Sequence, residues 1–179
     1  MARTLAEPPA DPAHYPFAHP IRVRFAETDA MGVVHHASYI PWLEETRVAL
    51  LAHGGHDYAE VHAGGLDLAV VDVVARYRRP VRFGDAVVVH AGVADASRSL
   101  IQIAYLVEAG SDTALTALTT HACVGRDGRP LRVPDWLSGL AEGATALPGQ
   151  LAALDGLGLA TGACRSGPMF PPEIGRAHV

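Results

Sequence analysis

The residues best suited to chemistry lie in one short stretch of the chain, residues 25–39. Asp29 supplies a carboxylate that could attack a carbonyl carbon or activate a water molecule. Gly32 lets the backbone turn without a steric penalty from a Cβ atom. His36 stands just before a helix-like run, so its N–H would lie at the unpaired, positive end of a helix. A carboxylate beside free N–H groups is suited to acyl transfer, in which such donors stabilise an oxyanion.

Two rigid elements are expected to position this stretch. A strand-like run at residues 21–25, ending near Glu27, leads into it, and an amphipathic run leads out of it. Ser38 is a suitable N-cap for a helix of roughly 15 residues, which Gly54 and Gly55 would end. The stretch is therefore predicted to connect a strand to a helix, a place where catalytic groups are common.

The remainder of the chain predicts an antiparallel sheet. A β-branched run favours a long strand at residues 66–79, and turn-rich segments of hairpin length separate the strands that follow. Those strands are expected at residues 85–94, 100–109 and 114–124, and a short helix at residues 134–140. Because the one long helix needs apolar cover, the economical packing is a strongly curved antiparallel sheet wrapped around one long central helix, an α+β architecture.

The stretch around the carboxylate resembles the signature of a known enzyme family. The pattern that carries the resemblance is Asp29-x-x-Gly32-Val33-Val34-x-His36-x-Ser38-Tyr39. It is similar to the active-site signature of hotdog-fold acyl-CoA thioesterases of the 4-hydroxybenzoyl-CoA thioesterase type, including those associated with the Tol-Pal system. Residues 42–47 and 76–85 resemble the family's central helix and the strand and turn after it, so the resemblance covers about residues 20–137. His35 departs from the pattern, because the family more often has an aromatic residue there.

The resemblance implies a hotdog fold and hydrolysis of an acyl thioester by Asp29, with the backbone N–H of His36 binding the thioester oxygen. The implied oxyanion and pocket residues are Gly32, Val34, His35 and Tyr39. The implied CoA-binding residues, on a hairpin near the subunit boundary, are Ser97, Arg98 and Ser99. Arginine suits such a site because it makes bidentate contacts with phosphate. The resemblance also implies a homodimer, or a homotetramer of paired dimers, with active sites at the junction of two copies.

Other functions stay open on the sequence. An Asp just after a strand is often only a turn residue, and a non-catalytic acyl-CoA binding protein would not need Asp29. A hotdog hydratase or dehydratase would need an Asp-x-x-x-x-His spacing, whereas His35 and His36 follow Asp29 at six and seven positions. A hydrolase triad is disfavoured, because the chain has no G-x-S-x-G motif and Cys123 and Cys164 lack catalytic neighbours. CoA and acyl carrier protein both remain possible carriers, and Asp29 is either a nucleophile or a general base.

Composition indicates one compact domain with less ordered ends. The chain has 179 residues and 49% hydrophobic content, which is enough for a single core, expected at residues 20–140. Residues 1–19, rich in Pro, Ala and His, are predicted to be a poorly ordered arm. Residues 141–179 have few charges and no sustained period, so we expect a low-complexity tail with a marginal helix near residues 150–159 that does not dock firmly.

The net charge and the spacing of the histidines argue against several classes of binding partner. A net charge of −5 argues against nucleic acid as the main partner. The N-terminal residues lack the apolar core of a secretory signal and no apolar run of ~18 residues occurs, so we expect a cytoplasmic protein without a membrane span. No cofactor or metal is expected, because His35 and His36 should point apart and the other histidines lack metal-ligand spacing. Glu27 and Glu44 are interpreted as structural. A solvated strand face and a nucleotide site are both compatible with Arg76, Arg78 and Arg82.

Overall fold

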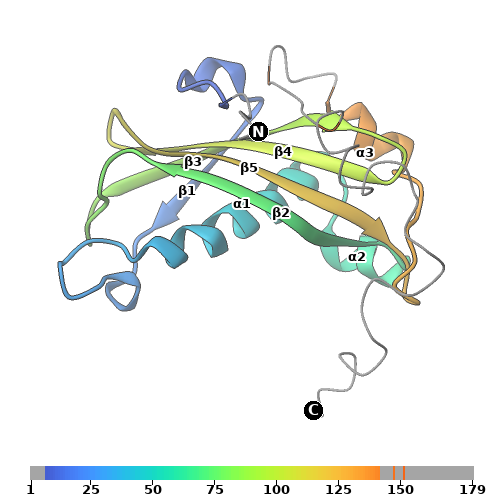
Figure 1. The fold of residues 1–179 in the computed structure, drawn as a ribbon, viewed down its shortest axis with the longest axis horizontal. Coiled ribbons are helices and arrows are strands. Elements are labelled where there is room, and N and C mark those ends of the chain that lie inside the picture. The colour runs from blue at the N-terminus through green and yellow to red at the C-terminus, as the bar shows by residue number, and fades with distance from the viewer. Residues whose placement is uncertain (1–6, 142–146, 148–150, 152–179) are drawn as a thin grey trace, which may run out of the picture.

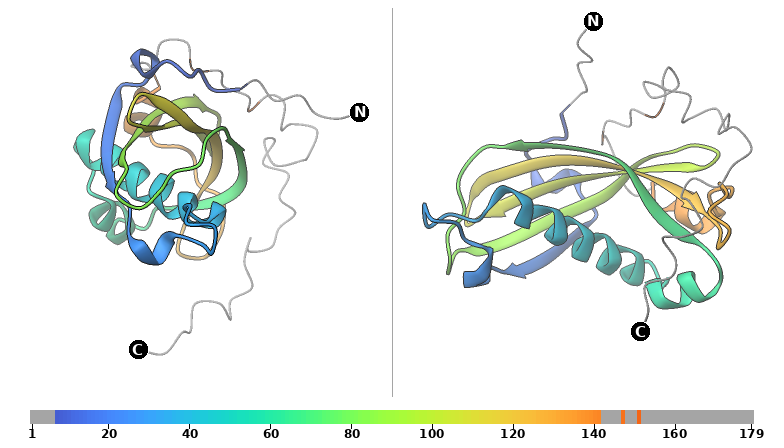
Figure 2. Two further views of the ribbon diagram at one scale, coloured as in Figure 1. Left: turned by 90° about the vertical axis from the view of Figure 1, so that its left-hand side faces the viewer. Right: turned by 60° about the horizontal axis from the view of Figure 1, so that its bottom comes forward.

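The computed structural model describes residues 7–141, 147 and 151 of the chain. In it, a five-stranded antiparallel sheet curves around one long helix, α1 (Tyr39–His53) (Figures 1 and 2). The strands are β1 (Phe17–Arg22), β2 (Asp67–Tyr77), β3 (Ala86–Ala96), β4 (Leu100–Ala109) and β5 (Asp112–Val124). Their order across the sheet is β1-β3-β4-β5-β2, so β1 and β2 form its two edges. This arrangement confirms the predicted hotdog fold.

Short helices connect these elements. They are α2 (Tyr58–Ala63), α3 (Asp135–Gly139) and the 3-10 helices η1 (Pro12–His14), η2 (Phe25–Glu27) and η3 (His36–Ser38). The helix expected at residues 134–140 is therefore present as α3. The hairpin segments expected between β3 and β4 and between β4 and β5 also connect the observed strands. Only the connections near α1 combine turns of several kinds, and these build the candidate site.

The core lies between α1 and the concave face of the sheet. Because side chains alternate across a strand, Ile101, Ile103 and Tyr105 of β4 all face this core and are almost fully buried. Leu51 of α1 is buried in the same cluster. The helix has 15 residues, as predicted, and is followed by Gly55, whose φ of +85° lies in the left-handed region that stops a helix. One face of α1 therefore fills the curve of the sheet.

The strand before the site lies earlier in the chain than predicted. β1 begins at Phe17 and pairs with β3, whereas the expected strand ran from Ile21 to near Glu27. The prediction was wrong at its end because the Glu27 carboxylate accepts the N–H of Arg24 at 2.8 Å and closes the turn η2. An extended strand cannot make this contact. A compact turn, and not a strand, carries the chain into the candidate site.

The convex face of the sheet is partly covered by residues from the predicted arm and tail. Tyr15 and Leu147 are buried there against β4 and β5, and the Tyr15 hydroxyl donates to the Pro9 carbonyl at 2.8 Å. Leu151 is buried in a further cluster that includes the end of β5. The expectation of an undocked arm and tail is therefore wrong at these positions, because apolar side chains seal the outer face. The helix predicted near residues 150–159 lies outside the described residues, apart from Leu151.

Candidate active site

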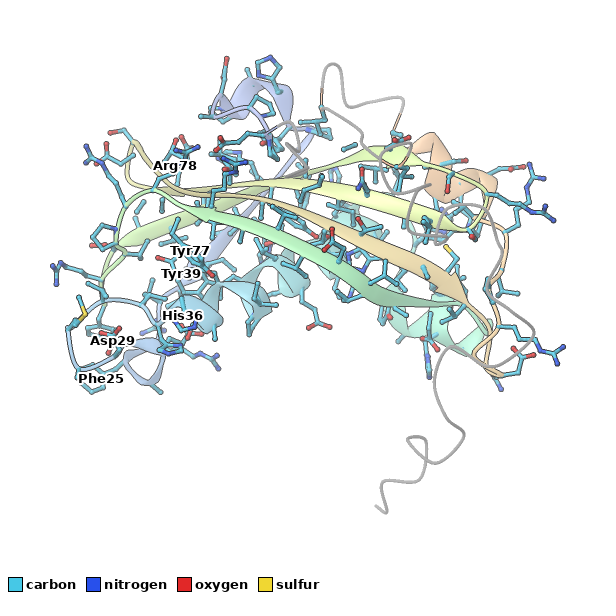
Figure 3. All side chains as sticks on the ribbon, in the orientation of Figure 1. Phe25, Asp29, His36, Tyr39, Tyr77 and Arg78 are labelled. Atoms are coloured by element: carbon cyan, nitrogen blue, oxygen red, sulfur yellow. The ribbon has the colours of Figure 1, made fainter. Side chains whose placement is uncertain are left out.

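Asp29 lies in a tight turn between η2 and η3, at one end of the sheet (Figure 3). The Gly32 N–H donates to the Asp29 carbonyl at 2.9 Å, and the Asp29 N–H donates to the Val33 carbonyl at 2.8 Å. Gly32 has a φ of +70°, the left-handed conformation that its position predicted. One carboxylate oxygen of Asp29 accepts the Met31 N–H at 2.8 Å, and the other has no hydrogen-bond partner among the described residues. Asp29 thus holds the turn with one oxygen and keeps the other available.

The chain enters α1 through η3, which begins at His36. The Ser38 N–H donates to the His35 carbonyl at 2.9 Å, and the Ala37 N–H donates to Nδ1 of His35 at 3.2 Å. The His36 N–H has no hydrogen-bond partner in the described part of the chain, and the residue is exposed. Because this N–H belongs to the N-terminal end of the helix, it carries partial positive charge and is a ready donor to an oxyanion.

Glu27 ties the turn to α1. Its buried carboxylate accepts hydrogen bonds from the Arg24 guanidinium at 2.7 Å and from the Trp42 indole at 3.1 Å. Its backbone carbonyl accepts the His35 N–H at 2.8 Å and the Ser38 hydroxyl at 3.3 Å. Burial alone would raise the pKa of Glu27, but the hydrogen bonds from Arg24 and Trp42 hold this pKa below its usual range. The charged carboxylate is therefore a structural anchor of the site, in agreement with its interpretation from the sequence.

Two of the predicted pocket residues form the floor under the turn. Val34 is buried, and its N–H donates to the Val81 carbonyl at 2.8 Å. Tyr39 is only 2% exposed, and its ring centroid lies 4.9 Å from that of Trp42. Burial raises the pKa of Tyr39, so its hydroxyl stays protonated at neutral pH. Within one protomer, both side chains are part of the core that supports the turn.

His35 and His36 lie side by side. Their ring centroids are 4.1 Å apart with an angle of 36° between the planes, so the expectation that they point apart is wrong. The reason is local, because Nδ1 of His35 accepts the Ala37 N–H and draws the ring back over the start of the helix. Among the described residues, no three His, Cys, Asp or Glu side chains gather closely enough to hold a metal ion. Both rings are exposed beside the candidate oxyanion donor.

The predicted CoA-binding hairpin lies at the other end of the sheet from Asp29 (Figure 1). It joins β3 to β4, and the Arg98 carbonyl accepts the N–H of Val133, which lies just before α3. Arg98 is exposed, and its guanidinium has no partner within the described residues. Ser99 is 8% exposed, and the Ser97 hydroxyl is also buried. Within this chain, the hairpin therefore does not come near Asp29, and of its three predicted CoA-binding residues only Arg98 has an exposed side chain.

Two further contacts to the site come from Tyr77, which the sequence did not single out, and from Arg82, for which it left a solvated strand face and a nucleotide site open. Tyr77, the last residue of β2, donates its hydroxyl hydrogen to the His36 carbonyl at 2.9 Å. The Arg82 guanidinium donates to the Gly32 carbonyl at 3.4 Å. These partners are separated by 41 and 50 positions in the chain. No local pattern could reveal them, although both belong to the segment that resembles the family's strand and turn after the central helix.

Similarity to known proteins agrees with this geometry. Residues 23–141 match a family model described as the thioesterase-like superfamily. The chain belongs to this superfamily. Its fold is that of a thioesterase-like protein, and the predicted enzyme class, a thioester hydrolase, is confirmed.

Individual relatives of this thioesterase-like chain cover the same region. A putative acyl-CoA thioesterase of Bacillus subtilis, YneP, is 33% identical over 122 residues, which are 65% of this chain and 88% of the relative. A 1,4-dihydroxy-2-naphthoyl-CoA hydrolase of Synechococcus elongatus is 28% identical over 127 residues, which are 67% of this chain and 93% of the relative. The crystal structure of the hypothetical protein TT1821 from Thermus thermophilus has a TM-score of 0.66 and 37% identity, and the match covers 69% of this chain and 98% of that one.

The similarities place the thioesterase-like chain in the superfamily without distinguishing its branch. The narrower resemblance, to the 4-hydroxybenzoyl-CoA and Tol-Pal-associated enzymes, is therefore part of the proposal below. None of the helices in the described part of the chain combines the length and the apolar character that a membrane crossing requires.

Proposed function

We propose that this thioesterase-like protein hydrolyses acyl-CoA to a free acid and CoA. The observation that carries the proposal is that two groups near the start of α1 are free to bind a substrate. One is the free carboxylate oxygen of Asp29 and the other is the free N–H of His36, both without a partner among the described residues. They lie at the same end of the molecule (Figure 3).

The chemistry follows from these two groups. Asp29 either attacks the thioester carbonyl carbon or takes a proton from a water molecule that attacks it. As the tetrahedral intermediate forms, the carbonyl electrons move to oxygen, and the His36 N–H stabilises that charge. When the carbonyl reforms, the C–S bond breaks and CoA leaves as a thiolate, which needs little help because thiols are far more acidic than alcohols. If Asp29 attacks, water then hydrolyses the acyl-enzyme anhydride.

Cys123 does not compete with Asp29 as the nucleophile. It is fully buried in the core below the sheet, and burial raises the pKa of its thiol to about 11. The reactive thiolate is therefore scarce at neutral pH. Cys164 lies outside the described residues.

CoA is the proposed carrier, because the similar proteins from Bacillus and Synechococcus are both named for CoA esters. The proposed branch is the 4-hydroxybenzoyl-CoA and Tol-Pal-associated type, on the strength of the residues that run from Asp29 to Tyr39. A cytoplasmic location is part of the same proposal.

A homodimer, or a homotetramer built from it, is the proposed assembly. β2 is an edge strand, and its Val70 and Val73 are 55% and 37% exposed. Apolar edge strands tend to pair with another strand. Two antiparallel copies of β2 around a two-fold axis would bring the hairpin end of one protomer toward the Asp29 end of the other. Arg98 of one copy would then contact the CoA phosphates of a thioester held at Asp29 of the other.

The test compares Asp29→Asn with a matched control, Asp57→Asn. Both aspartates accept the N–H of the second following residue at 2.8 Å, but Asp57 caps α2 at the other end of the molecule. We expect Asp29→Asn to lower kcat on acyl-CoA by roughly 10²–10⁴-fold, because the amide keeps the turn and loses the charge. Asp57→Asn should hydrolyse acyl-CoA at the parent rate.

Release of free CoA thiol, followed with a thiol reagent over a series of aliphatic and aromatic acyl-CoA esters, gives the readout. Full activity in Asp29→Asn would remove Asp29 from the mechanism. Stoichiometric binding of intact acyl-CoA without turnover would identify a binding protein. Hydration of an enoyl-CoA without thiol release would identify a hydratase.

A further inference from the structure

The end of β2 makes a specific contact with the turn that carries the proposed oxyanion donor. The Tyr77 hydroxyl donates to the His36 carbonyl at 2.9 Å, across 41 positions of sequence (Figure 3). The Tyr77 ring also meets the Tyr39 ring edge-on, with 5.3 Å between the centroids. Burial raises the pKa of Tyr77, so its hydroxyl remains a donor at neutral pH. The Tyr77 hydroxyl is therefore a donor at neutral pH, and its ring packs against Tyr39 on one side although Tyr77 is 48% exposed.

This bond acts on the peptide unit that joins His36 to Ala37. A donor on a peptide carbonyl polarises the N–H at the other side of the same unit, here that of Ala37. It also restricts rotation at His36, whose own N–H is free. In the structure, the Ala37 N–H donates to Nδ1 of the exposed His35 at 3.2 Å, toward the long end of the hydrogen-bond range. A thioester oxygen would compete with this nitrogen for the N–H. The helix start thus presents one free N–H, at His36, and one that is weakly engaged, at Ala37. The bond from Tyr77 acts directly on the peptide unit of the Ala37 N–H and, through the His36 backbone, on the orientation of the His36 N–H.

We propose that Tyr77 is a positioning residue for the oxyanion site, which holds the His36 peptide so that the N–H groups of His36 and Ala37 meet the charge developing on the thioester oxygen. The inference rests on the proposed thioesterase function and adds a residue to it. A purely structural role would make the bond matter for stability alone. The two roles differ in their effect on kcat, because an oxyanion donor acts on the transition state more than on the bound substrate.

The experiment compares Tyr77→Phe with Tyr15→Phe in the full-length protein. The two variants are matched, because each removes one tyrosine hydroxyl that donates to a backbone carbonyl, at 2.9 Å and 2.8 Å respectively. Tyr15 lies on the convex face, away from the proposed site. Melting temperature should fall less in Tyr77→Phe than in Tyr15→Phe, because Tyr77 is 48% exposed and Tyr15 only 8%. In Tyr77→Phe we expect kcat on acyl-CoA to fall about tenfold, with KM changed by less than about twofold. Tyr15→Phe should keep both constants.

A second measurement does not depend on turnover. Loss of the hydrogen bond to the His36 carbonyl should move the Ala37 amide nitrogen resonance upfield in Tyr77→Phe and leave it in place in Tyr15→Phe. A Tyr77→Phe protein with the altered resonance but the parent kcat would overturn the positioning role. An unaltered resonance would show that the bond is not formed in solution and would overturn it as well. If the parent protein itself hydrolyses no acyl-CoA, the proposed function fails, which is a different result from a parent that is active and insensitive to Tyr77→Phe.

Discussion

The two ends of the hotdog sheet differ in what they leave free. At the end with the Asp29 turn, one carboxylate oxygen of Asp29 and the His36 N–H have no partner among the described residues. The Met31 N–H holds the other Asp29 oxygen, whereas Glu27 and Tyr77 hold the segment that carries His36. At the hairpin end, the Arg98 guanidinium is exposed and has no side-chain partner within the described residues, whereas the unpartnered Ser97 hydroxyl is buried. The groups at the first end are therefore fixed in position, whereas the long Arg98 side chain at the second end is free to move toward a ligand.

Under the proposed assembly, this difference means that each protomer would contribute to two sites, with its Asp29 turn in one and its Arg98 hairpin in the other. The β3–β4 hairpin that carries Arg98 lies at the far end of the sheet from the Asp29 turn (Figure 1). In the proposed antiparallel dimer, the Arg98 hairpin of one copy would lie near the Asp29 turn of the other. If the proposed dimer forms, disrupting it should lower acyl-CoA hydrolysis most. Substitution in the Arg98 hairpin should change KM less, and substitution of a core residue between the two ends should change only stability.

Among the changes that test this comparison of the two ends, a charge on the exposed edge strand β2 is expected to have the largest effect on acyl-CoA hydrolysis. Val73→Lys places an ammonium on β2, where strand pairing between two copies would have to bury it. We expect light scattering to show monomers and acyl-CoA hydrolysis to fall more than about tenfold. Val88→Lys is the control, because Val88 is half-buried on β3, a strand whose two edges are already paired. A fully active monomer of Val73→Lys would show that each protomer has a complete site.

Arg98→Ala should have a smaller effect, confined to substrates that carry the nucleotide. Loss of a phosphate contact should raise KM for acyl-CoA several-fold, about tenfold at most, and leave the matching acyl-pantetheine ester unchanged. Arg129→Ala is the control, since Arg129 is also exposed at this end but forms an ion pair with Asp127 at 3.5 Å. Equal losses on both esters would remove Arg98 from the nucleotide site, and equal losses in both variants would indicate a general effect of charge.

A core group nearer the hairpin end should set the pH dependence of stability. His121 is buried on β5, and burial together with the charge of Arg47 lowers its pKa to about 3. The unfolded chain therefore binds the proton more readily between about pH 6.5 and 3, so stability is fully present above pH 6.5 and falls as the pH drops through this window.

From pH 7 to pH 5, this linkage should lower the free energy of unfolding by about 2 kcal/mol, measured by urea denaturation. Glu27 does not contribute in that interval, because its pKa is held below its usual value and its stabilisation is lost only at lower pH. His121→Gln should flatten the dependence between pH 7 and 5. A His121→Gln protein that kept the parent slope would assign the loss to other groups.

Local signals were sufficient for much of this architecture. β4 has the predicted bounds of residues 100–109, and α1 has the predicted length, since the turn-rich segments and the terminal glycines are local features of the sequence. The same holds for the Asp29 turn, whose glycine takes the expected left-handed conformation. The predicted cap by Ser38 was wrong, because its hydroxyl donates to the Glu27 carbonyl and makes no cap bond to the helix. The family resemblance then implied that the N–H of His36, at the start of the helix, acts together with Asp29.

Other features depended on contacts between distant segments. β1 could not be placed correctly, because its pairing with β3 and the Glu27 turn outweigh the apparent strand pattern. The hairpin of Arg98 could be recognised as a turn, but its distance from Asp29 follows only from sheet topology. The Tyr77 contact to His36 arises because sheet curvature brings the end of an edge strand over the start of α1. The sequence by itself determined the elements and the reactive turn, since those depend on nearest neighbours, and the tertiary structure decided which distant residues hold that turn, since register and curvature are properties of the whole sheet.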